Sequence, residues 1–230
     1  QFFFIQVEWG ESFRNVYIIE MFGNSILYSV GVTLANLVAM TLMAYATARF
    51  HFMYSRIVYA TVLVVMILPT VGSLASEVQL IKSMGLFNSV LGTYILKFNF
   101  LGMYFLVLYA MFKDIPKDFA DAGSVDGANQ FVIMIRIMLP MAKTALSTIF
   151  LLTFIGHWND YYTALVYLPS YPTLSYGLYY FVTESQISEI SASIPLHLSA
   201  CMMMALPTLI IFLVFNNKLL GNVSMGGIKE

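Results

Sequence analysis

The sequence predicts an all-α integral membrane protein, a polytopic helical bundle of about five spans that forms one transmembrane domain over residues 1–230. Three observations support this fold class. The composition is 60% hydrophobic, 16% aromatic and only 10% charged, far outside the range of soluble globular domains. Apolar runs long enough to cross about 30 Å of hydrocarbon recur along the chain. A single long polar interval, residues 117–144, separates them.

The N-terminal part is expected to contain an interfacial segment and two spans. Residues 1–23 mix aromatic and charged side chains, which favours a place at or just outside the membrane interface. Asn24 and Ser25 are expected to cap the first span, which runs to about Ala46. The second span covers about residues 57–74, with a kink at Pro69. That kink has two interpretations, a simple bend and a mobile break that lines a cavity.

Three further spans are expected over residues 91–112, 140–156 and 196–215. The first of these is interrupted by polar residues, and Lys97 is expected near its outer end or facing protein, because a cation exposed to lipid is costly. The last is expected to bend at Pro207. It also carries the single cysteine, Cys201, which is interpreted as a packing residue.

The Lys and Arg residues predict the orientation in the membrane. Eight of the eleven lie in three regions that share one side if five spans are counted, and three lie on the opposite side. The positive-inside rule places the group of eight in the cytoplasm. The polar interval is therefore expected on the cytoplasmic side. The eight are Arg49, Arg56, Lys113, Lys117, Arg136, Lys143, Lys218 and Lys229.

The polar interval has the pattern of a short docking helix. Pro116 suits the first turn, and Asp118 and Asp121 complement the positive end of the helix dipole. A helix is therefore expected from Lys117 to about residue 125. It carries mostly small residues and one large one, which is typical of an element that fits another protein's groove. Gly127 allows a sharp exit.

Seven residues of this interval carry a family resemblance. The spacing of Asp121-Ala122-Gly123, Gly127, Ile137, Leu139 and Pro140 resembles the EAA loop of ABC-importer transmembrane subunits. Asp121 stands where Glu is usual, and Gly123 stands where a second Ala is usual. Both exchanges lower helix propensity slightly, but they keep an acid and a small surface.

The resemblance implies that residues 117–127 form a cytoplasmic coupling helix that docks on a separate ATPase. The residues implied are Asp118, Phe119, Asp121, Ala122, Gly123, Asp126 and Gly127. The alternative is an ordinary amphipathic loop between membrane helices. The chain has no G-x-x-x-x-G-K-[ST] loop and no nucleophile-base set, so it is not expected to be an enzyme or to hold a cofactor or metal. ATP and Mg would belong to the partner.

A second segment narrows the resemblance. Gly156-His157-Trp158-Asn159-Asp160-Tyr161-Tyr162 and the following residues are similar to the Trp-Asn segment and outer loop of carbohydrate-uptake permeases, the class of the smaller maltose-transporter permease. Flat aromatic faces and amide or carboxylate groups suit ring-shaped polar ligands. The candidate lining of a substrate path is Trp158, Asn159, Asp160, Tyr161 and Tyr162. The alternative is an outer aromatic belt with Asn159 capping a helix.

The resemblance also implies partners and a location. They are a dimer of ABC ATPase subunits, a second and non-identical permease, and a solute-binding protein that meets an extracytoplasmic loop at residues 163–194. The location is the bacterial cytoplasmic (inner) membrane. A net charge of −1 argues against a nucleic-acid partner. Because the family usually has six spans and a cytoplasmic N-terminus, a further helix is expected before Gln1.

The resulting expectation is a permease subunit of an ATP-driven ABC importer that moves a carbohydrate, an oligosaccharide, by alternating access. Two alternatives stay open: an ABC importer for a non-sugar solute, and an ion-coupled secondary transporter. The second would need buried ionisable groups near mid-membrane. The predicted spans offer mainly Asn36, Lys97 and Asn99.

Overall fold

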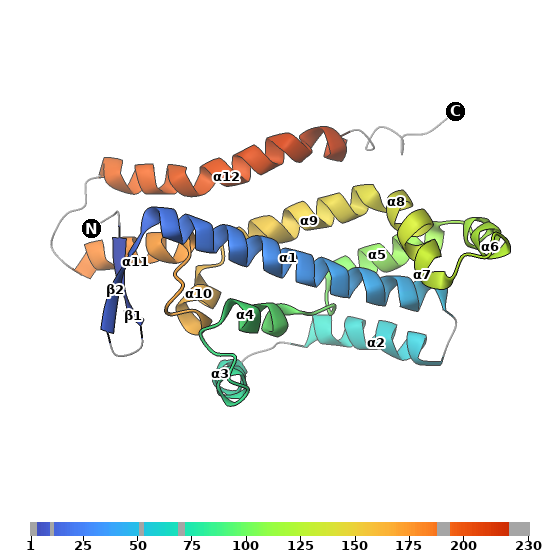
Figure 1. Cartoon of the computed structure of the whole chain (residues 1–230), viewed down its shortest axis with the longest axis horizontal. Coiled ribbons are helices and arrows are strands. Elements are labelled where there is room, and N and C mark those ends of the chain that lie inside the picture. Colours follow the sequence, from blue (N-terminus) through green and yellow to red (C-terminus); the bar gives the residue numbers. More distant parts are fainter. Residues whose placement is uncertain (1–3, 10–11, 51–52, 69–71, 188–193, 221–230) are drawn as a thin grey trace. The chain divides into compact units, whose positions relative to one another are not determined.

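The computed structural model describes residues 4–9, 12–50, 53–68, 72–187 and 194–220, and most of them are helical (Figure 1). A hairpin of β1 (Phe4–Trp9) and β2 (Ser12–Tyr17) comes first. The other elements are α1 (Ile18–Arg49), α2 (Met53–Ile67), α3 (Leu74–Ser83), α4 (Val90–Lys97), α5 (Met103–Asp114), α6 (Asp118–Val125), α7 (Gln130–Ile133), the π-helix η1 (Met134–Met138), α8 (Leu139–Met141), α9 (Lys143–Trp158), α10 (Tyr161–Tyr167), α11 (Leu174–Ile187) and α12 (Ile194–Leu220). The expectation of a largely helical protein is confirmed, but the hairpin was not predicted.

The chain divides into two compact units. The first unit comprises residues 1–34, 72–97 and 151–214, and the second comprises residues 35–71, 98–150 and 215–230. Each has its own clusters of buried apolar side chains.

The first unit begins with the antiparallel hairpin, in which Phe4 pairs with Tyr17 and Trp9 with Ser12. Three of its apolar side chains are buried against Met21 of α1, and Tyr176 of α11 packs on the same cluster. The three are Ile5, Val7 and Val16. The alternation of these positions along the strands puts them on one face of the hairpin.

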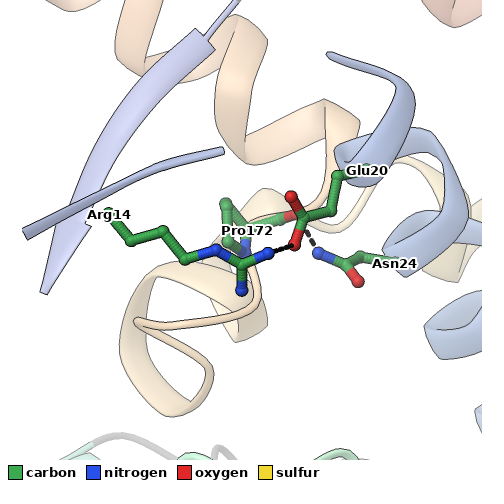
Figure 2. A network of polar contacts seen from close by, with 4 residues as sticks. All are labelled: Arg14, Glu20, Asn24 and Pro172. Atoms are coloured by element: carbon green, nitrogen blue, oxygen red, sulfur yellow. Dashed lines mark hydrogen bonds and ion pairs between the residues drawn. The ribbon is translucent and has the colours of Figure 1, made fainter. Parts of the chain in front are cut away.

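The start of α1 differs from the sequence expectation. The helix begins at Ile18, so Asn24 and Ser25 lie inside it and do not cap it. They bond instead to the chain before α11. Asn24 Nδ2 donates to the Pro172 carbonyl at 3.1 Å, and Ser25 Oγ accepts from the Leu174 amide at 2.7 Å. Figure 2 shows the first of these bonds beside the ion pair of Arg14 and Glu20, whose Nη2 and Oε1 atoms are 2.6 Å apart.

The second unit is built around one apolar cluster contributed mainly by α1, α2, α5, α7, η1 and the start of α9. Phe105, Leu108 and Phe112, on one face of α5, are fully buried in it. Their spacing of three and four residues is that of a helix face turned to the core. Tyr45 of α1 meets Phe112 edge to face, with ring centroids 5.6 Å apart. Because α5 packs along this cluster, the turn that follows it is held close to the core.

The described helices contain fewer full-length spans than the sequence suggested. α1 alone is long and apolar enough to cross a membrane, and residues 130–158 make a second candidate if their 78° bend lies within one span. Tyr54–Ile67 and Leu198–Val214 are apolar but shorter. Each of the five predicted spans overlaps at least one helix, while their number as membrane spans stays a prediction. Pro69 lies outside the described residues.

One predicted span needs correction. The expected span over residues 91–112 is interrupted, because α4 ends at Lys97 and α5 begins at Met103. Asn99 stabilises the segment between the two helices. Its backbone N–H donates to Asn36 Oδ1 at 3.2 Å, and its side-chain Oδ1 accepts from the Leu101 amide at 2.8 Å. The expected extracytoplasmic loop at 163–194 contains most of α10 and all of α11 among its described residues, and its place outside the membrane stays a prediction.

Candidate functional site

The predicted docking helix is present as α6, Asp118–Val125, within one residue of the expected start. Asp118 and Asp121 lie in its first turn, where carboxylates complement the helix dipole. The helix packs against α7 and η1 (Figure 1). The sequence thus predicted the element and its polarity from local features alone.

Gly127 ends α6 in the way its position suggested. Its φ is +80°, a left-handed conformation that favours glycine. The Gly127 amide donates to the Ser124 carbonyl at 3.1 Å, and the Ala128 amide donates to the Gly123 carbonyl at 3.0 Å. These two bonds form a Schellman motif, which satisfies carbonyls that the helix end would leave open. A residue with a side chain at Gly127 would be strained.

Gly123 has a different environment from the rest of the predicted docking set. It is buried, and a Cβ atom there would lie 2.8 Å from Ile137 Cδ1 and 3.2 Å from Ile133 Cγ1. The close approach explains why the helix has a glycine at this position despite its low helix propensity. It also gives a physical reason for the spacing between Gly123 and Ile137, because the two residues touch.

The other predicted docking residues form an accessible surface of α6 within the second unit. Exposed members are Asp118, Phe119, Asp121, Ala122, Asp126 and Gly127. Phe119 is 46% exposed, and Val125, which the sequence analysis did not single out, is 87% exposed. Their apolar side chains project among carboxylates, a mixture found at protein–protein docking sites. Val125 could have been noticed as the last large side chain before Gly127.

The segment after α6 re-enters a helix through a capped start. Asn129 Oδ1 accepts from the Val132 amide at 2.9 Å and caps α7. The helix then passes into η1, a π-helix over Met134–Met138. Such wider turns are rare and are often found at functional sites. No pattern in the amino-acid sequence predicted this π-helix.

The second candidate region lies at the break between α9 and α10. Trp158, the last residue of α9, is only 1% exposed. Its indole N–H donates to the Met204 carbonyl of α12 at 3.1 Å, while its ring stacks on Phe154 and meets Phe22 edge to face. The predicted path residue Trp158 is therefore surrounded by protein and fastens α9 to α12.

Asp160 is the centre of a polar network. It caps α10 through a 3.0 Å bond from the Thr163 amide to Oδ1. Its Oδ2 accepts from the Thr163 hydroxyl and, at 2.8 Å, from the Tyr28 hydroxyl of α1. Tyr28 is 1% exposed, and Thr163 is equally buried. Asp160 thus joins the start of α10 to α1, and these three bonds indicate a positioning role for its carboxylate.

The remaining three predicted path residues are exposed within the first unit. Asn159 donates to the Ile155 carbonyl at 2.8 Å and borders an open groove of about 630 Å³. Tyr161 stacks on Tyr179 of α11, with ring centroids 4.5 Å apart and planes 13° apart. Tyr162 is 47% exposed. The predicted set therefore separates into two side chains bonded to other helices, the buried Trp158 and the partly buried Asp160, and three exposed side chains.

The groove beside Asn159 is mostly apolar. Its lining comes from α9, α11 and α12, and is made of Ile155, Asn159, Leu178, Cys201, Met204, Ala205, Thr208, Leu209 and Phe212. Cys201 is exposed there, so its interpretation as a packing residue was wrong. Tyr179 was missed by sequence reasoning. The adjacent pair Tyr179-Tyr180 was a signal in the sequence, because two neighbouring aromatic hydroxyl residues are a type that suits sugar rings.

Helix α3 and the turn that follows it are bonded to the end of α10. Glu77 accepts from Ser73 Oγ at 2.6 Å and from Tyr167 Oη at 3.0 Å. The Asn88 side-chain Nδ2 donates to Ser170 Oγ at 2.7 Å, and the Asn88 backbone N–H donates to the Tyr167 carbonyl at 3.0 Å. These bonds fix the outer end of α10.

Both partners of the Glu77–Tyr167 bond have shifted pKa values. Hydrogen bonds from Ser73 and Tyr167 hold the pKa of the Glu77 carboxyl below its ordinary 4.5. Burial, with the hydrogen bond to Glu77, raises the pKa of Tyr167 to about 12. Since the folded state lowers the Glu77 pKa, the stabilisation is present above pH 4.5 and is lost as the pH falls through the lowered value.

Removing this bond is expected to loosen α3. In Tyr167→Phe, the Glu77 carboxylate loses a donor, and we expect trypsin to cleave after Lys82 about three to ten times faster. Glu77→Gln should give a smaller increase, because an amide oxygen still accepts a hydrogen bond. Tyr180→Phe, on α11, serves as a matched control. Equal cleavage rates in Tyr167→Phe and the unmodified protein would contradict a stabilising bond.

The chain belongs to the family of binding-protein-dependent transport system inner membrane components. The family model matches residues 31–218, most of the chain, including both candidate regions. This membership makes the protein a membrane component of a transport system.

Curated relatives are permease proteins of sugar transport systems. The chain is 28% identical to the arabinooligosaccharides transport system permease protein AraQ of Bacillus subtilis, over 90% of this chain and 73% of AraQ. It is 24% identical to the trehalose transport system permease protein SugB of Mycobacterium tuberculosis, over 95% of this chain and 81% of SugB. The family resemblance inferred from the sequence is therefore confirmed.

A solved structure supports the fold. It is a bacterial ABC transporter involved in the import of the acidic polysaccharide alginate, and one of its chains matches with a TM-score of 0.74. The match covers 87% of this chain and 74% of that chain at 23% sequence identity. The helices thus follow an ABC permease fold.

Proposed function

We propose that this chain is the transmembrane subunit of an ATP-driven ABC importer that translocates a carbohydrate, an oligosaccharide, across the bacterial cytoplasmic membrane. In this proposal about five membrane spans lie within residues 1–230. Family membership supports the transport role. The names of several relatives, which include arabinooligosaccharides and melibiose/raffinose/stachyose systems, support the substrate class.

The exposed surface of α6 carries the proposal. It is a short helix with two carboxylates in its first turn and two exposed apolar side chains, Phe119 and Val125. The Schellman motif at Gly127 and the contact of Gly123 with Ile137 hold it in a fixed conformation on the second unit. A rigid helix with an exposed mixed surface can fit a groove of a partner with little loss of entropy. The partner proposed is one subunit of an ABC ATPase dimer, which supplies ATP and Mg.

The substrate path is proposed to involve the break between α9 and α10. Asn159 offers an amide, and Tyr161 and Tyr162 offer aromatic faces and hydroxyls, groups that suit the edges and faces of a sugar ring. Trp158 and Asp160 would not contact the substrate. Their bonds to α12 and α1 would instead hold the backbone that carries Asn159, Tyr161 and Tyr162 in place. A second, non-identical permease completes the path, and an extracytoplasmic solute-binding protein meets residues 163–194.

Transport by this subunit requires that ATP favours one conformation. Changing a population from 1:99 to 99:1 takes about 5.5 kcal/mol of differential binding. The chain has no nucleotide-binding loop, so this free energy must arrive through contacts with the ATPase. In the proposal, α6 makes those contacts, and the helix pair around the bend at Ala142 carries the change towards the membrane.

The test combines two substitutions on α6 and its exit turn. In Gly127→Trp plus Asp121→Lys, the left-handed turn is strained and a docking charge is reversed. We expect the variant to stay folded in the membrane while recovery of the co-expressed ATPase falls at least tenfold, and ATP-dependent uptake of a labelled arabinooligosaccharide or trehalose in vesicles is lost.

Gly85→Trp is the matched control. Gly85 also has a positive φ, +68°, and space for a side chain, but it lies in the turn after α3. It should retain the ATPase. Full coupling in the Gly127→Trp plus Asp121→Lys variant would reject the docking assignment. Uptake that needs no ATPase would instead favour an ion-coupled secondary transporter, and ATP-dependent uptake of a non-sugar solute alone would reject the substrate class.

A further inference from the structure

Arg49, the last residue of α1, makes contacts on both sides of α6. Its Nη2 atom donates to the Ile115 carbonyl at 2.8 Å and approaches Met138 Sδ at 3.4 Å. Ile115 caps the C-terminus of α5, and Met138 ends the π-helix η1. The two acceptors therefore bracket the segment that holds α6 and α7. The guanidinium group of Arg49 thus contacts the chain just before α6 and just after α7.

The acceptor at Ile115 needs an external donor. Ile115 is the residue before Pro116, and it has the extended conformation, φ −65° and ψ 126°, that a following proline favours. The chain leaves α5 at this point, so the Ile115 carbonyl does not continue the helical bonding. Ile115 is also 8% exposed, which leaves its carbonyl little access to water. A buried carbonyl without a donor is unfavourable, and Arg49 supplies the donor.

The surroundings of Arg49 are apolar for a charged side chain. Its Nε atom is buried and has no hydrogen-bond partner among the described residues. Tyr45, one turn earlier in α1, packs edge to face on both Phe50 and Phe112 and forms one wall of this site. Met138 is fully buried on the other side. Arg49 is partly exposed, but taking the Nε atom of a guanidinium out of water without a hydrogen-bond partner is costly. A surface charge on the predicted cytoplasmic side does not by itself explain this arrangement.

We propose that Arg49 is a positioning residue that clamps the ends of the α6–α7 segment to α1 and thereby sets how α6 is presented to its partner. This inference rests on the proposed function for the partner, an ATPase, but the clamp itself is a property of this chain. Neither the sequence motif nor the predicted docking set contains Arg49. A guanidinium suits the task, because one of its nitrogens carries two hydrogens and reaches two acceptors at once.

The test compares amide hydrogen exchange in the purified chain with recovery of the co-expressed ATPase. In Arg49→Gln, we expect exchange at the amides of residues 117–128 to rise about tenfold, while the amides of α5 from Phe105 to Phe112 stay protected. Recovery of the ATPase should fall at least threefold. Arg49→Lys, whose ammonium can reach one of the acceptors, should restore part of both quantities.

Arg56→Gln is the matched control, because it removes an exposed positive charge from α2 on the same predicted side of the membrane. It should change neither quantity. The clamp is rejected if Arg49→Gln leaves exchange in residues 117–128 unchanged, if α5 loosens to the same extent, or if Arg56→Gln has the same effect. Failure of the proposed function looks different: the exchange pattern would appear as expected, but neither Arg49→Gln nor Gly127→Trp plus Asp121→Lys would lower recovery of the ATPase.

Discussion

Replacing Trp158 by Ala is expected to lower the apparent melting temperature of the solubilised protein by roughly 10 °C. The side chain is 1% exposed and packs between Phe154 and Phe22. Truncating a buried tryptophan leaves a large cavity, and such changes reduce the free energy of unfolding by about 3–5 kcal/mol. The Met204 carbonyl also loses its donor. Thermal size-exclusion profiles of the variant would measure the shift.

Two further variants separate packing from hydrogen bonding. Trp158→Phe keeps much of the ring but removes the N–H, so the loss should be about 1–2 kcal/mol, clearly smaller than for Ala. Tyr162→Ala, at a side chain that is 47% exposed, should change the melting temperature by only a few degrees. If Trp158→Ala and Tyr162→Ala had equal effects, the buried position of Trp158 would be wrong.

The location of this bond explains part of its importance. Pro207 lies inside α12 and has no N–H to donate to the carbonyl four residues earlier. The helix is therefore weakened at the turn that contains Met204. The indole of Trp158 donates to that turn from α9 and stabilises it from outside. α12 also contributes most of the residues that line the groove beside Asn159, and α9 contributes Ile155.

Helix α6 could be predicted from the sequence because its determinants are local. Pro116, the acids at Asp118 and Asp121, and Gly127 act within a few residues of their own positions, and the observed α6 ends at Val125 as expected. The role of Gly123 could not be derived in the same way. It depends on Ile137, fourteen positions later, and on the π-helix that brings Ile137 over it.

The helix breaks show the same contrast. Composition indicated an apolar run over residues 91–112, but the break after Lys97 is stabilised by the bond from the Asn99 amide to Asn36. Likewise, Asn24 and Ser25 resemble helix caps in sequence, yet a hairpin precedes them and α1 starts at Ile18. In both cases a partner distant in sequence provides the bonds, and its identity cannot be read from the local pattern.

The path residues were predicted as one set because their side-chain types suit a sugar. The structure separates them by exposure and by bonding partner. Trp158 and Asp160 bond to α12 and α1, whereas Asn159 and Tyr161 are exposed. Residue type indicated what each side chain could bind, but only the fold shows which ones already have protein partners.

Asp160 gives the second large expected effect. In Asp160→Ala, α10 loses its N-cap and the hydroxyls of Tyr28 and Thr163 lose a charged acceptor. A cap is worth about 0.5–2 kcal/mol, and a hydrogen bond to a charged group about 1.5–3 kcal/mol. We expect a loss of about 3–5 kcal/mol, because two buried hydroxyls are also left without this acceptor. The melting temperature would again report it.

A double-mutant cycle with Tyr28→Phe isolates the long-range bond to α1. Tyr28→Phe alone leaves the cap intact, so its effect should be smaller than that of Asp160→Ala. If the 2.8 Å bond stabilises the protein, the two changes together should cost less than the sum of the single effects, by about 1–3 kcal/mol. Strictly additive effects would mean that Tyr28 and Asp160 do not interact, and Asp160 would then be available to contact the substrate.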